Sequence, residues 1–221
     1  MKKINLLGMK LQDRYARESL MLTDRFLKKR AVHIMLYLTT AVLLEAAENE
    51  EEKAWIEAAD AILWGDTEIL KAAEITAKGR YYEVAEKGFL MDFLRRMAKT
   101  HKSILVISDT DEQAQSLKKE LIQMQNGITI VGTMTIQDTE DDRENIINAI
   151  NMMAPAVIIV RMPFVLQRKW LMLSRQYMNA GIWLGMPEDF SCTHKKEMPV
   201  EKMGRRILNV LLNRKVNKYK K

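Results

Sequence analysis

Polar side chains that can bind a phosphorylated ligand or move a proton follow directly after four short apolar segments of this chain. An apolar segment that runs into a polar loop and then a helix is typical of open α/β sheets, whose strand ends present ligand-contacting residues. Where such ends converge, Arg161 and Arg168 are candidates for the positive charge. The four polar groups are Thr39 with Thr40, Gly65 with Asp66, Ser108 with Asp109, and the segment 161–167.

Several of these residues also have a purely structural interpretation. Asp66 precedes a helical pattern, where a carboxylate caps free backbone N–H groups more often than it acts as a base. Gln167, near the start of another helix, can be a solvated first-turn residue. Arg205 and Arg206, in the C-terminal segment, can be surface residues that aid solubility. Residue type alone therefore leaves both interpretations open.

The apolar segments that must position these side chains are short, dense and rich in β-branched residues. Continuous rather than alternating apolar strands, separated by helical patterns, are typical of a parallel sheet covered on both faces. The sequence therefore predicts an α/β, Rossmann-like fold with a mostly parallel sheet and helices on both faces. The predicted strands are residues 32–38, 61–64, 104–107, 128–131, 157–160 and 182–184.

Helical periodicity and capping residues predict the connecting helices. Asp66 or Thr67 is expected to cap a helix that runs to about Ala77 and ends before Gly79. Thr139 is expected to open a helix that Pro155 closes, and residues 161–167 are expected to form a loop that contacts the ligand. Residues 42–59 are predicted to be helix-rich. The other helices are predicted over residues 14–30, 89–98 and 167–178, and from a start within 108–113 to an end at Gly127.

The net charge of +6 is unevenly distributed along the 221 residues. Residues 195–221 contain ten Lys or Arg and two Glu, a net charge of +8, so residues 1–194 sum to −2. Basic segments of this kind bind phosphate on nucleic acid, on lipid or on a substrate. We therefore divide the chain into an α/β domain over 1–194 and a basic amphipathic C-terminal tail over 195–221.

Several functional classes lack support in the sequence. The single cysteine, Cys192, excludes an intramolecular disulfide, and the three histidines have no metal-ligand spacing. The sequence also contains none of the standard dinucleotide-binding, NTPase, hydrolase or metalloprotease motifs. No apolar run reaches the roughly 18 to 20 residues that a membrane span needs, and the first residues do not form a signal peptide. We expect a cytoplasmic protein without a structural metal.

Five segments in order along the chain resemble the WecG/TagA/CpsF family of bacterial glycosyltransferases. After the strand VIIV, the segment RMPFVLQRKW aligns through Gln167 and Trp170 with the family's Pro-Lys-Gln-Glu-x-Trp block. LGMPEDF matches its Gly-Gly-x-x-Asp-Phe block at Gly185, Asp189 and Phe190. Gly65-Asp66 stands where the family has Asp-Gly. The other matching segments are INLLGMKLQDRYARESL, AADAILWGD and ITIVGTMTIQ.

The resemblance implies transfer of an amino sugar, such as N-acetylmannosamine, from a UDP-sugar to a lipid diphosphate-linked acceptor in cell-surface polysaccharide synthesis. It implies that Asp66 is a displaced catalytic base and that no metal or other cofactor takes part. It also implies association between copies of the chain through the globular body. The substrate-binding residues expected from it are Thr40, Arg161, Gln167, Asp189, Arg205 and Arg206.

Two further expectations concern the tail and the activity. Val200, Met203, Ile207, Val210 and Leu211 share one helical face, so the tail is expected to bind an anionic membrane at its inner, cytoplasmic side. A catalytically degenerate relative that binds nucleotide sugar, or assists an active transferase, is the main alternative. Nucleic-acid binding has only the charge in its favour, and we do not expect it.

Overall fold

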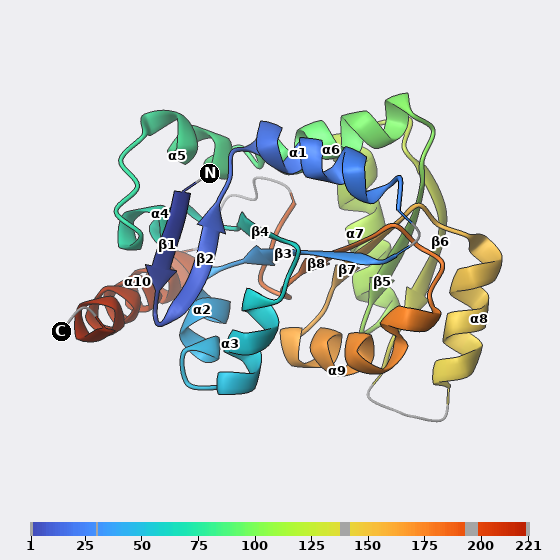
Figure 1. The fold of residues 1–221 in the computed structure, drawn as a ribbon. Helices are drawn as coiled ribbons and strands as arrows, with labels where there is room; N and C mark the ends of the chain where they lie inside the picture. Colours follow the sequence, from blue (N-terminus) through green and yellow to red (C-terminus); the bar gives the residue numbers. More distant parts are fainter. Residues whose placement is uncertain (1, 30, 138–141, 193–198, 220–221) are drawn as a thin grey trace.

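A six-stranded, fully parallel sheet forms the centre of the protein (Figure 1). The computed structural model describes residues 2–29, 31–137, 142–192 and 199–219. The strand order is β4-β3-β8-β7-β5-β6, so the predicted parallel α/β sheet is confirmed. The strands are β3 (His33–Leu38), β4 (Ala61–Trp64), β5 (Ser103–Ser108), β6 (Thr129–Thr135), β7 (Val157–Arg161) and β8 (Ile182–Met186).

The central strands are apolar throughout because both faces of the sheet are covered. On one face pack α1 (Ala16–Phe26), α6 (Gly88–Lys99) and α7 (Asp111–Met124), around Met35, Phe93 and Leu117. The opposite face is built around Leu36, Ile158 and Trp183. It is covered by α2 (Thr40–Ala46), α3 (Glu50–Glu57), α4 (Thr67–Ala72), α8 (Arg143–Met153) and α9 (Phe164–Ser174).

Side-chain caps decide where several helices begin, and the bounds of two helices correct one sequence expectation. The helix-rich segment 42–59 contains most of α2 and all of α3, and Asn49 accepts hydrogen bonds from Glu51 N and Glu52 N to start α3. The α4 helix ends at Ala72, and α5 (Lys78–Ala85) contains Gly79, so Gly79 does not stop a helix. Thr139 lies outside the described residues.

The loop expected over 161–167 is also wrong. Arg161 is the last residue of β7, and α9 begins at Phe164 after Pro163 in the N-cap position. Gln167 therefore lies in the first turns of a helix, followed at its far end by the 3-10 turn η1 (Arg175–Tyr177). Only two residues separate the end of β7 from α9.

An N-terminal hairpin precedes the sheet and was not expected from the sequence. It pairs β1 (Lys2–Leu6) with β2 (Met9–Asp13) in antiparallel register. The two-residue turn needs positive φ at both positions, and Leu7 (55°) and Gly8 (84°) supply it. The hairpin belongs to the same apolar core as α2 and α4.

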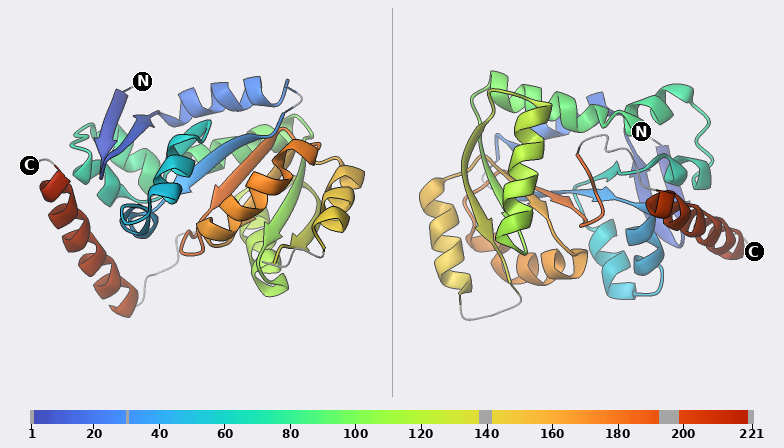
Figure 2. Two further views of the ribbon diagram at one scale, coloured as in Figure 1. Left: turned by 60° about the horizontal axis from the view of Figure 1, so that its bottom comes forward. Right: turned by 180° about the vertical axis from the view of Figure 1, so that it is seen from behind.

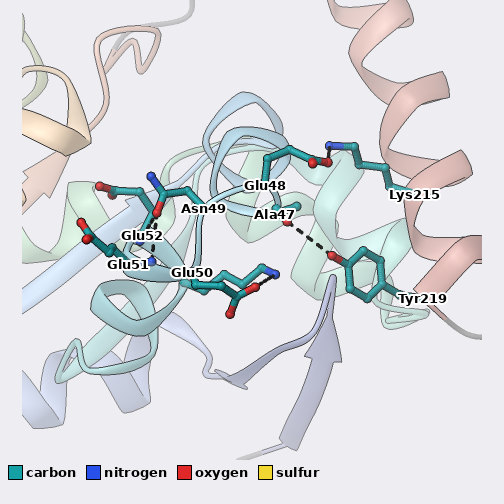
Figure 3. A network of polar contacts seen from close by, with 9 residues as sticks. Ala47, Glu48, Asn49, Glu50, Glu51, Glu52, Lys215 and Tyr219 are labelled. Atoms are coloured by element: carbon teal, nitrogen blue, oxygen red, sulfur yellow. Dashed lines mark hydrogen bonds and ion pairs between the residues drawn. The ribbon is translucent and has the colours of Figure 1, made fainter.

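The C-terminal helix α10 (Pro199–Tyr219) packs against the body through one face. Leu212 and Val216 are buried in the apolar core of α2 and α4. Lys215 donates to Leu44 O. It also pairs with Glu48, and the Tyr219 hydroxyl donates to Ala47 O (3.3 Å), as Figure 3 shows. Figure 2 shows α10 at one end of the molecule, beside the hairpin and α2. Within the described ranges, no helix is long and apolar enough to span a bilayer.

Candidate functional site

The carboxyl ends of β3, β4 and β8 bring polar residues from distant parts of the chain together. Thr39 and Thr40 follow β3, Gly65 and Asp66 follow β4, and Asp189 follows β8. These strands are hydrogen-bonded neighbours, because β3 pairs with β4 on one side and with β8 on the other. The hydrogen bonds of Asp66 to Thr40 and of Asp189 to Thr39 join the three strand ends into one site.

Asp66 holds the beginnings of two helices with one carboxylate. Its extended backbone (φ −140°, ψ 160°) places it as the N-cap of α4, where Oδ1 accepts from Ile69 N at 3.3 Å. The same carboxylate accepts the Thr40 backbone N–H at 2.7 Å and the Thr40 hydroxyl at 2.8 Å. Thr40 is the first residue of α2. The structural interpretation of Asp66 as a cap is therefore correct, and the carboxylate serves two helices.

The environment of Asp66 raises the pKa of its carboxyl group above the ordinary value. Burial is the main cause, and Glu68 adds to it, while the bonds from Thr40 and Ile69 act in the opposite direction. A carboxylate has about four acceptor positions, of which the described contacts occupy three. The group is thus a stronger base than an exposed aspartate, with one acceptor position on Oδ2 beyond its capping bonds.

Gly65 explains why the carboxylate at this strand end comes from position 66 rather than from position 65. Its backbone N–H donates to Leu38 O at 2.7 Å, which ties the end of β4 to β3. A Cβ atom at position 65 would lie 2.9 Å from both Leu38 O and Thr39 Cγ2, closer than real Cβ contacts. Only glycine fits this crossing of the two strands, so an acidic side chain has to come from position 66.

Asp189 forms the second acidic group of the site and accepts the Thr39 hydroxyl at 3.1 Å. Burial of the Asp189 carboxyl raises its pKa, while the Thr39 hydrogen bond and the charge of Lys87 act in the opposite direction. The pKa of Glu188 is also raised, first by desolvation and then by Asp109, Asp189 and Glu45. The edge of the sheet is therefore rich in carboxylates.

Lys87 is the cation that faces these acids, and sequence reasoning missed it. Its Nζ donates to Gly65 O at 2.7 Å and lies 4.5 Å from the centre of the Phe190 ring. Lys87 has a left-handed backbone (φ 54°) as the N-cap of α6. The only sequence signal is the Lys87-Gly88 pair before an apolar helix, which by itself indicates a cap rather than a site.

Gln167 and Gly185, two residues that carry the family resemblance, are interior residues. Gln167 is fully buried; its Nε2 donates to Met162 O and Met186 O, both at 2.9 Å, and its Oε1 accepts from Trp183 Nε1 at 3.2 Å. A Cβ at Gly185 would overlap Gln167 Oε1 and lie 2.8 Å from Leu36 Cδ2. Gln167 therefore joins the ends of β7 and β8, and the structure places its amide away from solvent.

Arg161 also faces the interior rather than a ligand. Its side chain is 8% exposed and forms an ion pair with Glu120 of α7 at 2.9 Å. The other Glu120 oxygen accepts Cys192 N at 3.1 Å, and Arg161 itself approaches Phe190 O at 3.5 Å. The pair fixes the segment after β8 over α7. Arg161 is thus buried, as Gln167 is, and its described hydrogen bonds go to Glu120 and Phe190.

The two arginines of the tail lie on α10. Arg206 is exposed, and the side chain of Arg205 lies outside the described residues. The face opposite Leu212 and Val216 exposes Met203 (64%), Ile207 (56%), Val210 (51%) and Leu211 (42%). The tail helix therefore has two apolar faces: one packs on the body and the other is open to solvent among basic residues.

Comparison with known proteins identifies the family of this chain. The family model described as glycosyl transferase WecG/TagA/CpsF family matches residues 4–199, which is most of the chain. The match contains the whole sheet and all three strand ends of the site, and it stops at Pro199, the first residue of α10. No curated protein matches this chain.

Proposed function

Because the chain belongs to the WecG/TagA/CpsF family of glycosyl transferases, we propose that it transfers an amino sugar of the N-acetylmannosamine type. The donor is a UDP-sugar, and the acceptor is a lipid diphosphate-linked sugar used in cell-surface polysaccharide synthesis. The observation that carries the proposal is the meeting of Thr40, Asp66, Asp189 and Lys87 at the carboxyl ends of β3, β4 and β8.

In this proposal Asp66 is the base that removes the proton from the acceptor hydroxyl. A general base must be within hydrogen-bond reach of that proton and have a suitable pKa. The burial that raises the pKa of Asp66 makes its carboxylate more basic, and Thr40 fixes its orientation through two bonds. Asp189, held by Thr39, is placed to bind a sugar hydroxyl beside it.

Positive charge must neutralise the diphosphate as UDP leaves. Lys87 is proposed for this role, since its Nζ bonds to Gly65 O at the site and its charge lowers the pKa of Asp189. Arg205 and Arg206 of the tail are the other proposed phosphate contacts. Arg161 is not retained in this role, because Glu120 already pairs with it in the interior.

The exposed face of α10 is proposed to bind the inner face of the cell membrane, where the lipid-linked acceptor is held. Met203, Ile207, Val210 and Leu211 are exposed together, and Arg206, Arg214 and Lys218 are exposed on the same helix. An amphipathic helix of this composition binds anionic lipid through apolar insertion and charge. Because Leu212 and Val216 hold the opposite face of α10 against the body, membrane binding by the exposed face would fix the orientation of the body on the membrane.

The proposal is tested with the purified protein, UDP-N-acetylmannosamine and a short-chain lipid-diphosphate N-acetylglucosamine. Release of UDP that requires both substrates supports the transferase. Saturable UDP binding without product formation, over a range of acceptor lengths, contradicts it for this substrate pair.

A catalytically degenerate family member is the second candidate, and one observation favours it. Gln167 and Arg161 are occupied by interior contacts, and Asp66 already accepts three hydrogen bonds. Such a protein would bind nucleotide sugar, or assist an active transferase, without turnover. Binding of UDP without release of UDP from the donor is the result expected of it.

A further inference from the structure

An open groove lies between α1 and α6, which pack side by side on one face of the sheet (Figure 1). Its volume is about 350 Å³, and its lining residues are separate from those of the candidate site. Ala16 and Phe89, in the first turns of the two helices, line one small cavity, and Asp24 pairs with Arg96 further along. The two helices therefore run in the same direction on either side of this α1–α6 groove.

The floor of the groove is apolar. Leu20 is half-buried against the core on this face of the sheet, while the Met21 side chain is 54% exposed. Arginine and lysine side chains along the walls add apolar surface through their methylene stems, because only their charged ends need water. Methionine is flexible and adapts to the shape of a contacting side chain. The floor can therefore receive apolar side chains of a partner.

Ion pairs neutralise two of the four cations that line the groove. Asp92 pairs with Arg95 at 2.6 Å within α6. Asp24 accepts from Arg96 Nε at 3.0 Å and also pairs with the other end of the guanidinium group. Because the second pair joins α1 to α6, it holds the two walls of the groove at a fixed separation.

The other two cations, Arg17 and Lys99, stand at opposite ends of the groove. Arg17 is in the first turn of α1 and Lys99 is the last residue of α6, and both side chains are exposed. Within the described ranges, neither of them pairs with a carboxylate. The α6 wall from Asp92 to Lys99 is about two helical turns long, which is roughly 10 Å. The groove thus has an unpaired positive charge at each end and an apolar floor between them.

This arrangement fits an amphipathic helix better than a membrane or a nucleic acid. The apolar floor is recessed between two helices, whereas binding to a bilayer needs apolar side chains that project into it. Two cations without carboxylate partners give few phosphate contacts, and nucleic-acid binding depends on many. A helix of a partner protein can place its apolar side chains into such a groove and its charged side chains along the rim.

We propose that the α1–α6 groove binds an acidic amphipathic helix of a partner protein. Two carboxylates seven residues apart on that helix lie on one face, at about the spacing of the groove, and pair with Arg17 and Lys99. Apolar residues between them on the same face contact Leu20 and Met21. Like charges on the rim reject basic helices, so the groove selects its partner by charge. The proposed sugar transfer does not involve this surface.

The test uses the full-length protein and a synthetic stapled helix of about 18 residues as the probe. The acidic peptide has two Glu residues seven positions apart with two Leu residues between them on the same face, and the basic peptide has Lys in place of both Glu residues. Calorimetry should show saturable binding of the acidic peptide with a Kd below about 100 μM. The basic peptide should not bind.

A charge reversal tests whether the groove makes the contact. Arg17→Glu/Lys99→Glu should bind the acidic peptide at least about tenfold more weakly and should bind the basic peptide instead. Lys71→Glu/Lys78→Glu changes the net charge equally at exposed positions of α4 and α5, so it is the matched control and should keep the wild-type preference. Met21→Ser should weaken binding of the acidic peptide, and Met21→Leu should retain it. The substituted positions are exposed, so the melting temperature should change little.

Two results with the peptides overturn the proposal. One is the absence of saturable binding of the acidic peptide up to about 1 mM. The other is an equal loss of binding in Lys71→Glu/Lys78→Glu, which would indicate general attraction to a protein of net charge +6.

Anionic vesicles test the membrane as the other occupant, in the Ile207→Asp/Leu211→Asp background that removes the proposed lipid contact of α10. Residual vesicle binding that Arg17→Glu/Lys99→Glu then abolishes would show that the groove faces lipid, and this result also overturns the proposal. Vesicle binding that the charge reversal leaves unchanged is the expected result.

Discussion

The Asp66 carboxylate accepts both the backbone N–H and the hydroxyl of Thr40, at 2.7 and 2.8 Å. The two residues come from the ends of neighbouring parallel strands, and each begins a different helix. One side chain thereby fixes the relative position of α2 and α4 and places a carboxylate of raised pKa at the edge of the sheet. The Asp66 carboxylate is therefore both a helix cap and the proposed base.

The raised pKa of Asp66 predicts how stability depends on pH. Relative to an ordinary pKa of 3.8, the folded protein holds this proton more tightly than the unfolded chain does. The contribution of Asp66 to stability is therefore fully present below 3.8 and is lost as the pH rises through the folded pKa. The free energy of unfolding of wild type minus that of Asp66→Asn should fall over this window in denaturant titrations. A difference that rises with pH would contradict the sign.

The Arg161–Glu120 pair predicts a large cost when either partner is removed alone. Both groups are buried, so Arg161→Met or Glu120→Leu leaves an uncompensated charge, at a cost of about 3–5 kcal/mol. The double variant should be more stable than either single variant, as urea unfolding can measure. If Arg161→Met unfolds like the wild type but loses UDP affinity, Arg161 is a phosphate contact after all.

Gly185 and Gln167 should be coupled, because a Cβ at position 185 overlaps the Gln167 amide. Gly185→Ala is expected to destabilise the wild type by about 1–3 kcal/mol through overpacking. In a Gln167→Ala background the added cost should be smaller by about 1 kcal/mol or more, although Leu36 still crowds the site. Additive costs in this double-mutant cycle would mean that the two side chains do not meet.

The two faces of α10 should separate membrane binding from stability. Ile207→Asp/Leu211→Asp changes exposed residues, so binding to anionic vesicles should fall at least tenfold while the melting temperature changes little. Leu212→Ala truncates a fully buried side chain and should lower the free energy of unfolding by about 2–5 kcal/mol. Undiminished vesicle binding by the double aspartate variant would place the lipid contact elsewhere.

The sheet could be predicted from the sequence because each strand is a continuous apolar segment, as strands buried on both faces must be. Features fixed by single backbone positions could not be predicted. The Leu7-Gly8 turn and the Asn49 cap each redirect the chain through one or two residues. The second apolar face of α10 was missed because Leu212 and Val216 acquire a partner only when the tail folds back on α2.

The candidate site could be predicted from the sequence only in part, for a related reason. Asp66 and Thr40 follow predicted strands, and the family resemblance adds Asp189, so the sequence places all three at the correct edge. Arg161 ends β7 and Gln167 lies in the helix after it, but their partners Glu120 and Met186 come from another helix and another strand. Whether a polar side chain at a strand end faces solvent or the interior depends on those tertiary partners.

The central claim, that Asp66 is the base of a sugar transfer, is tested most directly by one rate comparison. UDP release from UDP-N-acetylmannosamine, with saturating lipid-diphosphate acceptor, is measured for the wild type, Asp66→Asn and Asn49→Ala. Asn49→Ala removes a different cap, at a cost of about 1 kcal/mol, and should keep the wild-type rate. The account predicts that Asp66→Asn lowers the rate by about a hundredfold or more. A wild-type rate in folded Asp66→Asn would contradict it.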